Sequence, residues 1–243
     1  MKIFSVIPLI LLGTLLNAQV VVNEHLKGDW NDVKIALIND PDGYTNIRNE
    51  PGTNSEVIDK LLEGEFFRYW PNTESNWLVV YKFDRLYGYV HKSRILDLDD
   101  IEDSEFRQLC LETFQKELEL APDLYDRNYR PTPEESKEIR DFHELKYYQV
   151  LPRFVDYCTK TKDEELLTLF FKTVNAWPDD ETPDFYLGKL FLAEPDWINK
   201  MVRSKPEGNM DALVWGFKNV IYNKEGDYSY HISLIKAFWY DDE

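Results

Sequence analysis

The sequence predicts an α+β multidomain chain in which a small β-barrel is followed by an all-helical domain. Two features of the sequence support this fold class. Between residues 40 and 95, short runs rich in β-branched and aromatic residues alternate with clusters of Gly, Pro and Asn, as in small barrels. After about residue 101, apolar residues recur at helical spacing between helix-capping signals. The acidic run at 97–105 marks the junction, so we expect a barrel domain over 19–98 and a helical domain over 99–243.

Residues 1–18 have the features of a signal peptide. Lys2 precedes an apolar run over 3–16, and Ala18 offers a cleavage point. The run is too short for a comfortable membrane span, so we expect no integral span after signal removal. The chain is therefore predicted to be exported, either periplasmic or secreted. Residues 35–38 are expected to form a strand that pairs with the edge of the barrel.

Several short motifs between residues 44 and 95 resemble, in their order, the bacterial SH3 (SH3b) family. Residues 44–48 (YTNIR) resemble the opening L-N-V-R strand of that family, and the loop that follows has its Pro and Ser. Residues 76–80 (NWLVV) match a W-x-x-V strand, and 87–91 (YGYVH) match the closing G-Y-V-H motif. The resemblance covers about a quarter of the chain and implies an SH3-like β-barrel.

The SH3b resemblance implies a binding module without catalytic activity. Relatives hold cell-wall peptides or other peptide ligands in a groove of aromatic residues and loops. The residues here that would supply such a groove are Tyr44, Arg48, Trp70, Trp77, Tyr87 and Tyr89. Two alternatives stay open: the rings fill the barrel core, or Arg48 ties its loop to a nearby acid instead of binding a ligand carboxylate.

Gly88 lies between two of these aromatic residues, Tyr87 and Tyr89. The two tyrosines share a face of the sheet if their strand is regular, so both belong to the core or both are available to a ligand. A glycine between them leaves room for the backbone of a ligand.

The remainder of the chain is predicted to be helical. Capping residues indicate helices that begin after Thr132, after Thr161, at Thr182-Pro183, at Pro195 and after Asn209, with a last helix over 230–239. Pro152 is expected to end or kink the helix that contains it. The repeated Thr-Pro-acid start suggests HEAT-like hairpins, and an irregular bundle explains the pattern equally well.

The two cysteines, Cys110 and Cys158, both lie on predicted apolar helical stripes. Export would permit a disulfide between them, whereas buried free thiols pack as small hydrophobic groups. No surrounding motif resembles that of a cysteine peptidase, so we expect no enzymatic activity. We also expect no metal and no cofactor, because the acidic run near Asp99 lacks the glycine and the spacing of a calcium loop.

The formal net charge of −17 argues against nucleic acid as a partner. We therefore expect a non-catalytic binding protein of the bacterial cell envelope that recognises a peptide, cell-wall or protein ligand. One alternative is an acidic periplasmic immunity or inhibitor protein that neutralises a basic toxin. A second is an accessory part of a cell-wall hydrolase.

Overall fold

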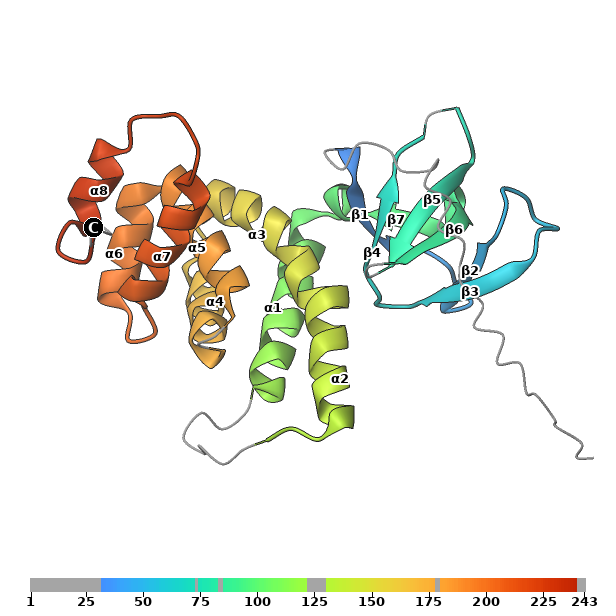
Figure 1. Ribbon diagram of the computed structural model, residues 1–243, viewed down its shortest axis with the longest axis horizontal. Coiled ribbons are helices and arrows are strands. Elements are labelled where there is room, and N and C mark those ends of the chain that lie inside the picture. Colours follow the sequence, from blue (N-terminus) through green and yellow to red (C-terminus); the bar gives the residue numbers. More distant parts are fainter. Residues whose placement is uncertain (1–31, 73, 83–84, 122–129, 178–179, 240–243) are drawn as a thin grey trace, which may run out of the picture.

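The computed structural model describes residues 32–72, 74–82, 85–121, 130–177 and 180–239 (Figure 1). The predicted signal peptide lies outside these residues. In the described chain, strands occupy the N-terminal part and helices the C-terminal part, and α1 follows the last strand after one short 3₁₀ turn. The change from strands to helices near residue 98 is therefore confirmed.

The described strands form one antiparallel seven-stranded sheet in the order β3-β2-β6-β5-β4-β1-β7. Their bounds are β1 (Lys34–Ile38), β2 (Tyr44–Arg48), β3 (Val57–Leu62), β4 (Phe67–Trp70), β5 (Trp77–Lys82), β6 (Arg85–His91) and β7 (Ile95–Asp97). The strand expected at 35–38 is present, and it pairs as expected with the edge of the 40–95 strands, which is β4; on its other side it pairs with β7. Strands β1 and β7 thus extend the sheet beyond β4, and β3 forms the opposite edge.

One face of the sheet packs around a hydrophobic cluster to which every strand contributes. Leu78 and Val80 of β5 point into it, whereas the alternate residues Trp77, Val79 and Tyr81 are only partly buried. The other members come from the remaining strands, including those at both edges of the sheet: Ala36, Ile38, Ile47, Leu61, Phe67, Tyr69, Val90 and Ile95. We call the opposite side of the sheet the outer face.

The helical part contains eight described α-helices and one π-helical segment. They are α1 (Asp103–Leu120), α2 (Pro133–Phe142), the π segment η5 (His143–Tyr147), α3 (Tyr148–Thr161), α4 (Glu164–Ala176), α5 (Glu181–Ala193), α6 (Pro195–Ser204), α7 (Met210–Ile221) and α8 (Ser229–Ile235). Helix α1 packs on α4, α3 on α5, and α5 on α7.

Most of the predicted helix starts are confirmed, and two predicted caps are wrong. Thr132 and Glu135 exchange the two hydrogen bonds of a capping box. The Asn209 side chain accepts a hydrogen bond from the amide of Ala212. Thr161, expected to cap a helix, is instead the last residue of α3. The cap of α4 is Asp163, because Lys162 before it adopts a left-handed conformation that ends the preceding helix. Helix α5 is capped by Asp180, which accepts a hydrogen bond from the amide of Thr182, so Thr182 lies inside the helix that it was expected to start.

Pro152 does not end its helix, because α3 continues to Thr161. It lies inside α3, one turn after the π segment η5. A proline cannot donate to the carbonyl four residues earlier, which here belongs to Tyr148, the residue that follows the wide turn. The π segment His143–Tyr147 lies directly before α3, on the N-terminal side of the proline.

Buried residues next to the strands pack in the same hydrophobic core as the helices. Phe66, Leu98 and Ile101 belong to the same hydrophobic cluster as the core of the helices. The amide of Phe66 donates to the carbonyl of Leu145 in the π segment, at 3.1 Å. The guanidinium of Arg153 donates to the carbonyls of Leu98 and Ile101. These bonds join the end of the sheet directly to η5 and α3.

Candidate functional site

A hollow of about 390 Å³ opens on the outer face of the sheet. One side is formed by the turn before β2 and by β2 itself, with Asp40, Asp42, Tyr44, Thr45, Asn46 and Arg48. The remaining lining comes from the loop after β2, the start of β5, the end of β6 and the 3₁₀ turn that follows it (Lys92–Arg94), with Thr53, Trp77, His91, Ser93 and Arg94. We refer to this site as the outer hollow.

The outer hollow lies where β2 and β6 diverge. Among the described residues, these two strands pair only at Arg48 and Tyr89. Beyond that pair, toward Asn46 on β2 and His91 on β6, the strands separate and their residues line the hollow. The site is therefore a local opening of the sheet, bounded at one end by the Arg48–Tyr89 pair.

Gly88 allows β2 to approach β6 at this pair. Its φ is +147°, and a Cβ at this position would lie 2.1 Å from the carbonyl oxygen of Arg48. The space beside Gly88 is thus occupied by the protein's own backbone, so the expectation that it admits a ligand backbone is wrong. The strand is also irregular: Val80 faces Gly88 whereas Tyr81 faces Leu86, which leaves Tyr87 as the extra residue of a bulge.

Because of this bulge, simple alternation no longer requires Tyr87 and Tyr89 to share a face. The side chain of Tyr87 lies outside the described part of the chain. Tyr89 is partly buried next to Arg48, and burial together with the nearby charge of Glu50 raises the pKa of its hydroxyl. Tyr89 is not among the described residues that line the outer hollow.

Two of the predicted aromatic residues do line the outer hollow. Tyr44 is 38% exposed and carries Lys60 4.0 Å above its ring. Trp77 is partly buried and meets His91 edge-on, with 5.3 Å between the ring centroids. Trp70 is only 7% exposed, contacts Tyr81 and does not line the hollow. Tyr44 and Trp77 thus flank the opening from opposite sides, and Trp70 belongs to the interior.

Arg48 is the third predicted residue in the outer hollow. Its Nη1 donates to the backbone carbonyl of Ser55 at 2.5 Å, so it ties its loop through a carbonyl rather than through an acid. A guanidinium has five N–H donors, and no other bond of Arg48 is present among the described residues. The remaining donors are available to an anion.

The part of the outer hollow that contains Asp40, His91 and Arg94 was not predicted from the sequence. Asp40 is nearly buried and forms an ion pair with Arg94 at 2.9 Å, although the two lie far apart in the chain. His91 contacts Ser93 through Nδ1 at 2.8 Å. The sequence signal for these residues was weak, because turn clusters and the residues after a last strand are commonly polar.

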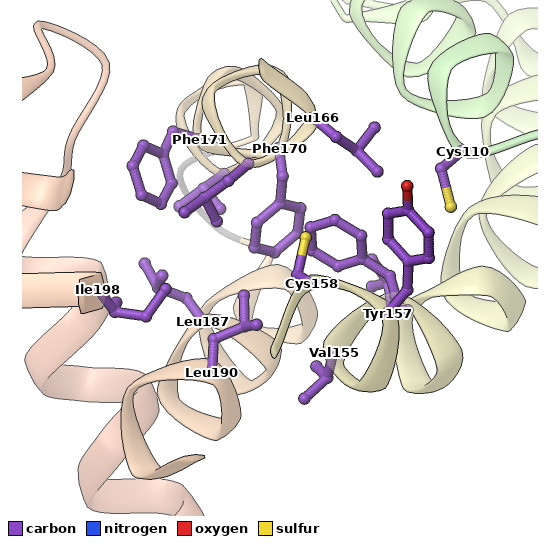
Figure 2. Close-up of a cluster of buried hydrophobic side chains, with 14 of the residues drawn as sticks. Cys110, Val155, Tyr157, Cys158, Leu166, Phe170, Phe171, Leu187, Leu190 and Ile198 are labelled. Atoms are coloured by element: carbon purple, nitrogen blue, oxygen red, sulfur yellow. The ribbon is translucent and has the colours of Figure 1, made fainter. Parts of the chain in front are cut away.

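The two thiols are unsuited to nucleophilic chemistry. Cys110 and Cys158 are both free and fully buried within the helical core (Figure 2). Burial raises the pKa of each thiol well above its ordinary value, so both remain protonated at neutral pH. The disulfide considered from the sequence is not formed in this structure, and the thiols pack as small apolar groups.

The acidic run at the end of the sheet has structural partners. Asp97 accepts hydrogen bonds from Lys34 and Tyr69, at 2.8 and 2.7 Å. Burial opposes ionisation here, and these bonds outweigh it and lower the pKa of Asp97. Asp103 pairs with Lys160 at 2.6 Å. In the described part of the chain, no group of three or more His, Cys, Asp or Glu side chains is arranged to hold a metal ion.

A buried polar chain in the helical part was not predicted. Glu117, on the apolar stripe of α1, is fully buried and contacts Nε2 of His143 at 2.9 Å. Tyr148 lies 3.2 Å from the other ring nitrogen and donates to Asp180 at 2.7 Å. Burial raises the pKa of Glu117, and the bond to His143 opposes this effect. The available signal was a carboxylate three residues after Phe114, on the face that packs inward.

Comparisons with known proteins assign no relationship. No family model, no curated protein and no solved structure matches this chain. Among the described residues, no helix is both long enough and apolar enough to span a membrane.

Proposed function

We propose that this chain is an exported, non-catalytic binding protein of the bacterial cell envelope whose outer hollow binds a peptide of the cell wall. The observation that carries the proposal is the position of Tyr44, Arg48 and Trp77. Tyr44 and Arg48 come from β2 and Trp77 from β5; all three were predicted from sequence to bind a ligand, and they line the same opening. Aromatic rings and a guanidinium at one site suit a peptide, which offers apolar side chains, carbonyls and carboxylates.

The proposal includes an SH3-like barrel as the scaffold of the site. Support comes from the hydrophobic cluster of the sheet, to which Leu61 of edge strand β3 and Ile95 of edge strand β7 both contribute. A flat sheet of this width would hold its edges roughly 29 Å apart, since neighbouring strands lie about 4.8 Å from each other. A strongly curled sheet brings both edges toward a common core.

Export is proposed from the signal-like pattern at residues 1–18. The absence of catalysis is proposed because the thiols are protonated and buried. Incubation of the protein with purified cell wall should therefore release no soluble fragments, and N-terminal sequencing of the exported protein should begin after Ala18.

The decisive experiment is titration of the protein with soluble peptides prepared from digested cell wall, followed by NMR. We expect shifts of the backbone amides of Asn46 and His91. Tyr44→Ala should lose about 2 kcal/mol or more of binding with little change in melting temperature, because its ring is substantially exposed. Tyr222→Ala is the matched control, since Tyr222 is 75% exposed and does not line the hollow. Unchanged affinity of both Tyr44→Ala and Trp77→Ala would remove the hollow as the binding site.

A further inference from the structure

The charges of the outer hollow are separated along β2. At the turn before the strand, Arg94 neutralises Asp40, and the exposed carboxylate of Asp42 has no ion pair among the described residues. At the far end, Arg48 uses one N–H on Ser55 and has further donors available. One end of the opening therefore favours a cation and the other favours an anion.

The distance between these ends excludes a small ion as the natural occupant. Tyr44, Asn46 and Arg48 alternate along the outward side of β2, with Thr45 and Ile47 buried between them. A strand rises about 3.3 Å per residue, so Arg48 lies roughly 13 Å from Tyr44 and somewhat farther from Asp42. An extended peptide covers this span with about four or five residues. Its middle would pass between Tyr44 and Trp77.

The overall charge of the protein also restricts the net charge of the ligand. A chain with a net charge of −17 repels an anionic ligand at long range. A ligand with one positive and one negative end has no net charge, so it escapes this repulsion and still satisfies both ends of the hollow.

We infer that the outer hollow selects a short zwitterionic peptide, with its α-ammonium group beside Asp42 and its α-carboxylate on Arg48. This inference rests on the proposed function and adds to it the length and the free ends of the ligand. Asp42 and Arg48 are then the specificity-determining residues, whereas Tyr44 and Trp77 contact the middle of the ligand without distinguishing its ends.

The test uses three forms of penta-alanine: free, N-acetylated and C-amidated. Isothermal titration at low salt compares their affinities for the full-length mature protein. Each blocked form should bind roughly three- to tenfold more weakly than the free peptide, as expected for a hydrogen-bonded charge contact at a partly exposed site. The preference should diminish as salt is raised, because the charges are accessible to solvent.

Variants assign each end of the peptide. Asp42→Asn should bind the free and acetylated peptides equally while still discriminating against the amide. Arg48→Gln should show the opposite pattern, and Arg48→Lys, which keeps the charge, should retain the preference for a free carboxylate. Asp59→Asn is the control, because Asp59 is an exposed acid of the neighbouring strand outside the hollow.

The inference is overturned if either blocked peptide binds as tightly as the free one, or if the free peptide does not bind at all. The proposed function is judged separately, by the Tyr44→Ala titration with cell-wall peptides. If those peptides bind at the hollow and the penta-alanine series shows no discrimination, only the zwitterion inference fails. If Tyr44→Ala and Trp77→Ala also leave the binding of wall peptides unchanged, the hollow is rejected altogether.

Discussion

Gly88→Ala should damage the sheet at the closed end of the outer hollow. A methyl group at this position would lie 2.1 Å from the carbonyl oxygen of Arg48 and 3.1 Å from the side chain of Ile58. The first contact is with backbone, so a side-chain rotation cannot relieve it. The φ of +147° is in addition unfavourable for any residue with a Cβ.

The cost follows from these two contributions. Backbone strain at such a φ costs about 1–3 kcal/mol, and forcing an extra methyl into occupied space costs about another 1–3 kcal/mol. We therefore expect Gly88→Ala to lower the free energy of unfolding by about 2–6 kcal/mol. That is a large part of the 5–15 kcal/mol of stability that is typical of a folded domain.

Urea denaturation measures the global loss, and hydrogen exchange locates it. Exchange should accelerate in β2 and β3, because β2 is joined to β6 only at the Arg48–Tyr89 pair among the described residues. Gly43→Ala is the matched control: its φ of +73° is also strained, but its Cβ would meet nothing closer than 3.7 Å. If Gly88→Ala costs no more than Gly43→Ala, the close approach of Arg48 is not what limits this position.

Three further outcomes are expected. Burial, followed by the charges of neighbouring acids, raises the pKa of Asp184 to about 7. The stability that depends on the neutral carboxyl of Asp184 is fully present below about pH 4 and is lost as the pH rises toward 7. The melting temperature of Asp184→Asn should therefore decrease less between pH 5 and pH 8 than that of the parent protein. Glu117→Ala should lower the free energy of unfolding, measured in urea, by about 3–5 kcal/mol, because it leaves buried His143 without its carboxylate. Glu117→Gln should lower it less, and equal small losses for the two variants would contradict this. Cys110 and Cys158 should react with a thiol reagent only on unfolding, and rapid labelling of the native protein would refute their burial.

Local signals were sufficient to predict the change from strands to helices near residue 98 and most of the helix starts. Turn residues, alternation and capping act within a few neighbours, so they can be read without knowledge of the fold. Alternation along β5 likewise places Trp77 and Leu78 on different faces of the sheet, and only Leu78 belongs to the hydrophobic cluster. The capping signal was misleading at Thr161. Lys162 in the left-handed conformation ends α3, and the cap of α4 is Asp163, two residues after Thr161.

Contacts between distant segments account for what the sequence did not reveal. The ion pair of Asp40 with Arg94 depends on the pairing of β1 with β7, in which Ile38 faces Ile95. The burial of Glu117 depends on the π segment that brings His143 to it. The bulge at Tyr87 and the Arg48 carbonyl beside Gly88 are likewise set by strand pairing. Such pairings join residues far apart in the chain, and their geometry is determined by packing and by the loss of conformational entropy rather than by local propensity.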